Sequence, residues 1–422
     1  MNKIRQNPII LIELLYLLIP TALVFSRAIS DLLLIIIVIF FIIYSIKNQI
    51  FHYYKNKFFL LFIIFCIFLI SVSLIKNNQI PISVLFFFRF GFFSLATWFM
   101  LDNNNKLGKK ILYSIFFTCS VVIVDAFFQY LFGYNIFGYE LSNKSERLSG
   151  FFKDELILGS YITRLGPLFL LQMFIFFTIN KNYFYSPVIY SFILFSYTFI
   201  VFLTGERTAF IYFLLTMLLV LVFLEKKISF SILMIVISSF ILFTFTGENR
   251  LIKTTKLQIY QSLSKNDELK IQFKKFDEIP VPHLKHWKSS YLMAKENPLF
   301  GVGPRMFREE CNKPKYFVQD GCANHPHNLY FQISAEAGIV GLLFLISYFI
   351  YILIIMFSSL NKIFFSSSIK NETMVCFSAL GLFLHLFPFL PNGNFFNNWT
   401  NIITFLLMGI LLHFRYKQKI DD

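Results

Sequence analysis

Charge is scarce in this sequence of 422 residues, since Asp, Glu, Lys and Arg together make up only 14% of it. Soluble domains carry about 25% charged residues, so the composition argues against one large water-soluble globule. Hydrophobic residues make up 57% of the chain, and the mean hydropathy is +0.66. Because about 20 apolar residues span a bilayer as a helix, this composition can supply about 12 membrane helices.

Acidic residues are the scarcer charge, with 23 Asp and Glu against 38 Lys and Arg and a formal net charge of +15. In a soluble chain such an excess would suggest nucleic acid as a partner. Here most basic residues lie in short loops between apolar runs, which indicates membrane topology and no nucleic-acid partner. The positive-inside rule then predicts that both termini are cytoplasmic. The first apolar run lacks a small-residue cleavage site and is expected to be a retained helix.

The apolar runs predict an all-α polytopic membrane protein, because only helices satisfy their own backbone groups in lipid. They lie near residues 7–26, 31–46, 58–75, 80–101, 111–132, 156–179, 186–204, 208–224, 228–246, 328–357, 372–391 and 396–414. We therefore expect spans one to nine in 1–246, one large outer loop at 247–327, and spans ten to twelve with a cytoplasmic tail in 328–422. In a bacterial inner membrane the outer side is the periplasm, and we expect the loop to form an ordered cap with a short helix near 284–295.

Cysteine is also scarce, with five residues. Three lie within apolar runs, where Cys acts as a small hydrophobe: Cys66, Cys119 and Cys376. Cys311 and Cys322 lie in the outer loop, in a compartment where disulfides persist, so we predict a disulfide between them. Closing a loop of about a dozen residues contributes roughly 3 kcal/mol. Two free thiols, or metal ligation with His325 or His327, are the alternatives.

Polar residues gather in four clusters at the expected outer ends of the spans. They comprise Asp125, Gln129, Arg147, Gly150 and Gly159; the run from Thr204 to Arg207; the run from Asn297 to Arg305 followed by Arg308; and the run from His325 to Gln332 with Glu336 and Gly338. An outward-facing site would bring such clusters together.

The fourth cluster is the most specific. The stretch HPHNLYFQISAEAGIVGLLFL, preceded by NPLFGVGPRMF, resembles the O-antigen ligase and polymerase superfamily, and RLSGFFKDELILGSYI and TGERTAF also match its pattern. The resemblance covers roughly residues 120–350. It implies a membrane-embedded, GT-C-like glycosyltransferase that needs no metal or cofactor. Such enzymes move a glycan from undecaprenyl diphosphate to an acceptor hydroxyl at the periplasmic face. Ligases use the lipid A core as acceptor, and polymerases use another lipid-linked glycan.

The resemblance also implies roles for individual residues. The family's catalytic His carries over to His327, which fits the need for a general base to take the proton of a neutral hydroxyl. His325 is a weaker candidate, because Pro326 forces a turn between the two. The family's phosphate-binding Arg carries over to Arg207, since a guanidinium grips phosphate oxygens and stays charged.

The chain departs from the family pattern four residues before Trp287, where His283 replaces a common second Arg and is itself a candidate diphosphate-binding residue. Lys285, Arg305 or Arg308 could supply the missing diphosphate contact. Arg147 could be a further diphosphate-binding cation, or a solvated loop charge.

Two arginines, Arg89 and Arg164, fall within apolar runs. They could line the groove for the carrier diphosphate, pair with Asp125, or extend to the membrane surface. His385 is expected to be a buried structural residue.

Two other functions compete with glycan transfer. A transporter or flippase of lipid-linked glycans would also have many spans, but transporters tend to show repeated halves, and this sequence shows no such repeat. An envelope assembly protein without chemistry is the other alternative, and the retained His327 and Arg207 argue against it. Nothing in the sequence identifies the sugar, or decides between ligase and polymerase.

Overall fold

The computed structural model describes residues 7–141, 147–179, 186–223, 226–245, 282–365 and 369–421. Within these ranges the regular secondary structure is helical, and an isolated β-bridge joins Tyr134 to Glu140. The expected all-α class is therefore confirmed. Residues 247–281 of the expected outer loop lie outside the described residues, so its full extent stays a prediction.

The chain forms two compact units, each built from distant segments: Met1–Ser30 with Asn104–Lys256, and Asp31–Asn103 with Leu257–Asp422. Each unit thus consists of two segments that are separated in the sequence by a segment of the other unit. The expected division of the chain into 1–246, 247–327 and 328–422 concerns membrane topology and stays a prediction.

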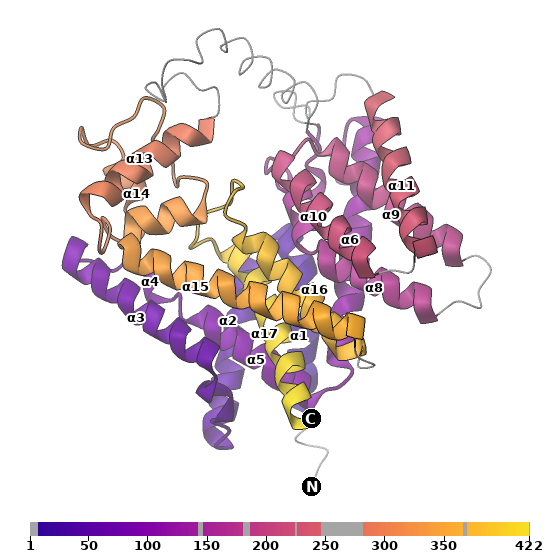
Figure 1. The fold of residues 1–422 in the computed structure, drawn as a ribbon, viewed down its shortest axis with the longest axis horizontal. Coiled ribbons are helices and arrows are strands. Elements are labelled where there is room, and N and C mark those ends of the chain that lie inside the picture. The colour runs from indigo at the N-terminus through magenta and orange to yellow at the C-terminus, as the bar shows by residue number, and fades with distance from the viewer. Residues whose placement is uncertain are drawn as a thin grey trace. The chain divides into compact units, whose positions relative to one another are not determined.

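The first unit is an all-helical bundle. Its elements are α1 (Asn7–Phe25), α6 (Leu107–Phe132), the short 3-10 helix η2 (Gly150–Phe152), α7 (Leu158–Arg164), α8 (Gly166–Ile179), α9 (Ser186–Leu203), α10 (Arg207–Phe223) and α11 (Lys226–Phe245). A hydrogen bond of 3.0 Å between Thr21 and Thr118 joins α1 to α6. The Tyr161 hydroxyl donates to the carbonyl oxygen of Pro20 at 2.8 Å, so the short helix α7 is held against α1. Figure 1 shows α9 and α11 side by side.

The second unit begins at Asp31, so it contains all but the first turn of α2. Its elements are α2 (Arg27–Lys47), η1 (His52–Lys55), α3 (Lys57–Asn77), α4 (Ile82–Leu85), α5 (Arg89–Asn103), α13 (Pro282–Glu296), α14 (Phe307–Glu310), α15 (Leu329–Phe365), α16 (Ile369–Leu386) and α17 (Asn398–Asp421). Helices α5 and α17 approach closely because Gly409 has no side chain: a Cβ there would lie 2.4 Å from Cβ of Thr97. Small residues commonly allow such close packing between membrane helices.

Several helices have the length and composition of membrane spans. Among the described residues, five qualify: Arg27–Lys47, Lys57–Asn77, Ile82–Asn103, Leu107–Phe132 and Leu329–Ile363. Shorter apolar helices accompany them at Ile9–Phe25, Val188–Leu203, Arg207–Leu221 and Ile232–Ile241. The chain is therefore a multi-pass membrane protein, while the count of twelve spans stays a prediction.

The run expected to span at 156–179 is broken in two, since α7 and α8 meet at a bend of 54°. The break coincides with Gly166 and Pro167, and Pro is favoured in the first turn of a helix but not in its interior. A Cβ at Gly166 would lie 2.6 Å from the Tyr197 hydroxyl, so a side chain at this position would have to displace the Tyr197 ring.

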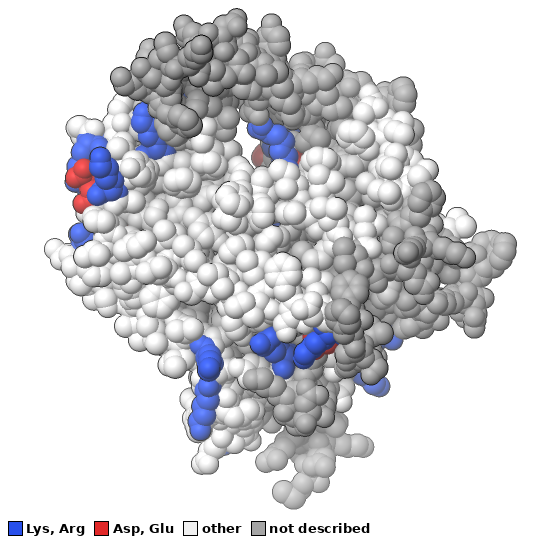
Figure 2. All heavy atoms as spheres, in the orientation of Figure 1, with Lys and Arg blue, Asp and Glu red and all other residues white. Residues whose placement is uncertain are grey.

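The exposed surface suits a lipid environment. Large apolar side chains such as Leu18, Ile67 and Val124 are more than half exposed. On the face shown in Figure 2, the described residues are mostly uncharged, and Lys and Arg gather in a few small groups. Helices that face lipid are expected to carry such side chains outward, because acyl chains are as apolar as Leu.

Candidate functional site

The turn before α15 holds His327 in one conformation. His327 has φ of 58°, in the left-handed region that non-glycine residues rarely adopt. Asn328 caps the helix: its Oδ1 accepts from the backbone N–H groups of Tyr330 at 2.9 Å and Phe331 at 3.2 Å. Its Nδ2 donates to the carbonyl oxygen of Pro388 at 2.7 Å. The His-Asn pair of the motif therefore combines a projecting imidazole with the cap that orients it.

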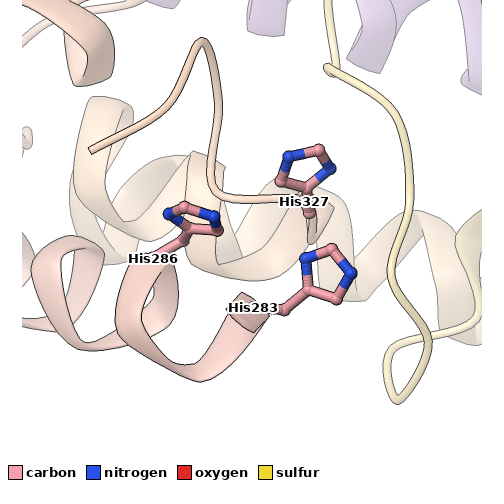
Figure 3. Close-up of side chains that lie close together, drawn as sticks. All are labelled: His283, His286 and His327. Atoms are coloured by element: carbon pink, nitrogen blue, oxygen red, sulfur yellow. The ribbon is translucent and has the colours of Figure 1, made fainter. Parts of the chain in front are cut away.

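Four imidazoles gather at this turn. His283 and His286 lie three residues apart on α13, so they share one helix face. Figure 3 shows their rings beside that of His327, which comes from the turn before α15. The ring centroid of His327 lies 4.8 Å from His283, 5.5 Å from His286 and 4.2 Å from His325. The sequence interpretation missed His286, although the His-x-x-His spacing on an amphipathic helix was a usable signal.

Burial keeps the two motif histidines neutral at pH 7. The pKa of His325 is lowered to about 4, first by burial and also by the neighbouring His286, His283 and Arg305, while a hydrogen bond with the Asn392 backbone acts in the opposite direction. Burial likewise lowers the pKa of His327 to about 3, with added effects from His325, His283 and His286. Each neutral ring keeps one nitrogen able to accept a proton.

The motif histidines border an open cavity of about 740 Å³. Its lining includes Arg308, Glu309, Asn312, Cys322, His325 and His327. A substrate hydroxyl could reach either imidazole from this side.

Two other residues of the motif serve the fold. The side chain of Glu336 accepts from the backbone N–H of Phe307 at 3.2 Å. Gln332 Nε2 donates to Glu336 Oε2 at 3.2 Å, and Gln332 Oε1 accepts from the backbone N–H of Phe395 at 2.9 Å. These buried side chains tie the segments before α14 and before α17 to α15. The second segment was not singled out in the sequence.

Glycines of the third and fourth polar clusters allow two backbone segments to pack directly against each other. We call this contact, between residues 299–303 and 335–338, the glycine interlock. Val302 N–H donates to the Ala335 carbonyl at 2.8 Å, and a Cβ at Gly301 would lie 2.4 Å from the carbonyl carbon of Glu336. Gly338 has φ of 65° and breaks the helical geometry inside α15. A Cβ there would lie 2.3 Å from the Leu299 carbonyl oxygen. The third and fourth polar clusters are thus two halves of one packed structure.

A small core supports the histidine turn. It consists of Met293, Val302, Phe307, Cys311, Tyr316 and Ala335. Cys311 and Cys322 form a disulfide, the pairing expected from the sequence, with Cα atoms 5.3 Å apart. Trp287 of α13 stacks on Phe331 of α15 with ring centroids 5.1 Å apart. Residues 282–327, which we call the cap, are therefore ordered, with α13 at the position of the helix expected near 284–295. Their place on the outer side of the membrane stays a prediction.

The candidate cations near the histidines differ in their surroundings. Lys285 pairs with Asp320 at 2.9 Å. The Arg308 side chain is half exposed and lies 3.8 Å from Glu309. Arg305 is half buried with φ of 69°, and its charge lowers the pKa of His325. Of the cations proposed to replace the family's second Arg, Arg308 is the one that lines the cavity.

In the first unit, Arg147 is held by protein groups. Its guanidinium donates to the carbonyl oxygens of Thr204 at 3.1 Å and Leu156 at 3.0 Å, and it pairs with Glu206 at 3.2 Å. The Arg147 side chain is only 17% exposed, which contradicts the alternative of a solvated loop charge. The contacts instead give it a structural task at the Thr204 turn, and a diphosphate role stays a prediction.

Glu206 is the centre of that turn, and its importance was not anticipated. Its two carboxylate oxygens accept from the backbone N–H groups of Gly159 at 3.0 Å and Ser160 at 3.1 Å. Burial raises the pKa of Glu206 to about 7, although the Arg147 charge and the two N–H groups favour ionisation. Arg207 follows as the first residue of α10 and is exposed, and its predicted diphosphate role is untested by the described contacts.

The first polar cluster also has a structural role. Asp125 accepts from the backbone N–H of Ile136 at 3.0 Å. Gln129 Oε1 accepts from the N–H groups of Ser149 at 3.0 Å and Gly150 at 2.8 Å. These buried side chains fold the segment after α6 back onto that helix.

The two intramembrane arginines have neighbours within their own units. Arg89 pairs with Asp31 at 3.0 Å. Arg164 donates to the Ser160 hydroxyl at 3.1 Å and lies over the Tyr212 ring. His385 is buried and lies 2.9 Å from the Thr404 hydroxyl, which fits the structural role expected for it.

Comparison with known proteins gives one finding. Residues 190–346 match the model of a protein family described as O-antigen ligase. The matched range contains the Thr204 turn, α13, the glycine interlock and the histidine turn. A search of curated proteins found no match.

Proposed function

We propose that the chain is an O-antigen ligase-like enzyme that moves a glycan from undecaprenyl diphosphate to an acceptor hydroxyl of the lipid A core. The match of residues 190–346 to the O-antigen ligase family supports this proposal. We place the reaction on the periplasmic side of the bacterial inner membrane, with both termini cytoplasmic. The disulfide between Cys311 and Cys322 supports that side for the cap, since disulfides persist in oxidising compartments. The family itself indicates a glycosyltransferase-type membrane enzyme that acts on lipid-linked glycans.

One observation carries the proposal: the imidazoles of His325 and His327, with ring centroids 4.2 Å apart, both border the open cavity. As the acceptor oxygen attacks the anomeric carbon, its proton passes to His327. His325 is the second candidate for this base. The bond between the anomeric carbon and the diphosphate oxygen breaks, and its electron pair leaves with the diphosphate.

Fixed cations would stabilise the departing diphosphate, whose charge rises as the bond breaks. We assign this role first to Arg207, because the family's phosphate-binding Arg carries over to it. In the second unit, Arg308 and Arg305 are the candidates that replace the family's second Arg at His283. Arg308 is favoured because it lines the cavity beside the motif histidines.

The second candidate function is a polymerase of the same superfamily. It would use the same base and leaving group, and another lipid-linked glycan would occupy the acceptor position. A lipid-linked glycan transporter is a weaker candidate, since transport alone would not need neutral imidazoles at a cavity.

The test compares His327→Ala and His327→Gln with the wild-type protein at matched membrane levels. We expect both to lose the surface polysaccharide ladder on gels, and His52→Ala, a change at an exposed histidine outside the cluster, to keep it. A normal ladder in both His327 variants would refute its role as base. In a deletion strain, complete loss of long chains indicates a ligase, and a single attached repeat indicates a polymerase. Transport of the glycan lipid into vesicles without transfer would favour the transporter.

A further inference from the structure

We propose that His283, His286 and His327 form a binding site for a divalent transition-metal ion of the zinc class. The resemblance to O-antigen ligases implies metal-independent chemistry, so the ion is not a requirement of the proposed transfer. The site would be an addition of this chain, which has His283 where the family commonly has Arg.

The geometry carries the proposal. Each of the three residues offers a ring nitrogen, and these nitrogens all lie within 4.8 Å of one another. Bound to zinc at about 2.0–2.1 Å each, they would lie roughly 3.4 Å apart. Reaching that arrangement requires each ring to shift inward by less than roughly 1 Å. Rotamer adjustments of this size are within reach of side chains that are only partly buried.

The orientation of His286 supports the same reading. Its Nδ1 lies 3.0 Å from the carbonyl oxygen of Gly321. A carbonyl oxygen only accepts, so Nδ1 carries the proton and Nε2 keeps the lone pair that a metal would bind. Metal-binding histidines commonly donate their other N–H to a carbonyl, which fixes the ring and its tautomer. Gly321 adjoins Cys322, so the disulfide helps to position the Gly321 carbonyl that holds the His286 ring.

The surroundings allow an ion to enter and to keep a water ligand. His327 borders the open cavity, and the Arg308 and Glu309 side chains that also line it carry opposite charges. Lys285, on the same helix as His283, is paired with Asp320. Three protein ligands and one open position match the coordination of accessible zinc sites. Imidazole nitrogen favours zinc, copper or nickel, whereas magnesium and calcium prefer oxygen ligands.

The consequence for activity rests on the proposed function. An ion bound to His327 occupies the lone pair that would accept the proton of the acceptor hydroxyl. Zinc binding should therefore inhibit transfer. The site would then tie glycan transfer to the concentration of free transition metal outside the membrane.

Binding is tested first, on the full-length protein purified in detergent through a tag without histidines. After equilibration with zinc and dialysis, we expect one ion per chain, and with cobalt a visible absorption spectrum typical of tetrahedral nitrogen coordination. His286→Ala should bind zinc more than about tenfold more weakly, because even loss of an outer-shell partner costs that much. His52→Ala should bind like the wild type. His286→Gln, which keeps most of the side-chain volume, serves if His286→Ala fails to fold.

No zinc bound to wild-type protein, or equal binding by the wild type and both His286 variants, would overturn the metal site and leave the proposed function untouched. Activity is tested separately, with each protein compared to its own zinc-free rate. We expect zinc to inhibit the wild type at the concentration at which it binds, and to inhibit His286→Ala only at about tenfold more zinc or above. Binding without inhibition would support the site and refute His327 as the base.

Discussion

The carbonyl oxygen of His327 accepts a hydrogen bond from the backbone N–H of Asn392 at 2.7 Å. The bond joins the turn before α15 to the segment that precedes α17, 65 residues further along the chain. Asn328 strengthens the same junction through the Pro388 carbonyl. The strained backbone of His327 is therefore held from outside its own motif, and the position of the candidate base depends on contacts that no local sequence pattern specifies.

Replacing Asn328 should disturb the candidate base more than the fold. Asn328→Ala removes the cap of α15 and the bond to Pro388, which together contribute about 1–3 kcal/mol. We expect a lower unfolding temperature in detergent and a loss of glycan transfer of more than about tenfold, because small displacements of catalytic groups are costly. Asn328→Asp keeps the capping oxygen but places a buried carboxylate oxygen against the Pro388 carbonyl, so it should keep the cap and still lower the unfolding temperature. Transfer at wild-type rate by a stable Asn328→Ala protein would contradict this role.

The glycine interlock should not tolerate a side chain at Gly338. Gly338→Ala combines a positive φ with a Cβ placed 2.3 Å from the Leu299 carbonyl oxygen, so the backbone must move. We expect destabilisation of more than about 2 kcal/mol, seen as lower yield and a lower unfolding temperature. Gly393→Ala is the matched control, since the nearest atom to its Cβ would be 3.8 Å away. Equal behaviour of the two variants would show that the interlock is looser than the structure indicates.

The raised pKa of Glu206 predicts a pH dependence of stability. Burial moves this pKa from 4.5 to about 7, so the folded chain binds the proton more tightly than the unfolded chain between these values. Stability should therefore fall as the pH rises from about 4.5 to about 7, by at most about 3 kcal/mol. Thermal unfolding at several pH values measures this.

Two variants isolate that effect. Glu206→Gln cannot ionise, and its unfolding temperature should depend less on pH across the same window. Glu155→Gln alters an exposed acid that pairs with Arg27, and should keep the wild-type slope. Identical slopes in all three proteins would assign the pH dependence to other groups.

Reduction should loosen the cap without dissolving the membrane helices. The disulfide closes a loop with a sequence separation of 11, and a loop of this size is worth roughly 3 kcal/mol. We expect Cys311→Ser with Cys322→Ser to make residues 282–327 more sensitive to limited proteolysis. Cys66→Ala, at a buried free cysteine, should keep the wild-type pattern and its response to reductant. Unchanged proteolysis in the double variant would show that the small core around Met293 suffices.

Local patterns predicted most helices because membrane helices satisfy their backbone groups within one segment. The run expected at 111–132 became α6 (Leu107–Phe132), and the run at 208–224 became α10 (Arg207–Phe223). The break between α7 and α8 was not predicted, although Gly166 and Pro167 mark it. Continuous hydrophobicity concealed it, because hydropathy reports how well a segment suits lipid and not its direction.

The sequence singled out residues that the structure brings together, while their roles stay predictions. His327, His325 and His283 do lie together, but Gln332 and Glu336 of the same motif hold neighbouring segments in place. Arg147 serves the Thr204 turn, and Glu206 does more there than its place in the sequence suggested. The same polar side chains can bind a substrate or hold the protein's own backbone in place. The sequence alone therefore does not tell which of the two tasks a given motif residue has.

The sequence by itself determined that this chain is an all-helical membrane protein whose short motifs resemble those of O-antigen ligases, since hydrophobicity and short motifs are properties of contiguous residues. Only the tertiary structure decided that His286 joins the motif histidines and that Asn392 holds His327. Those outcomes depend on segments far apart in the chain, brought together by packing that no single segment encodes.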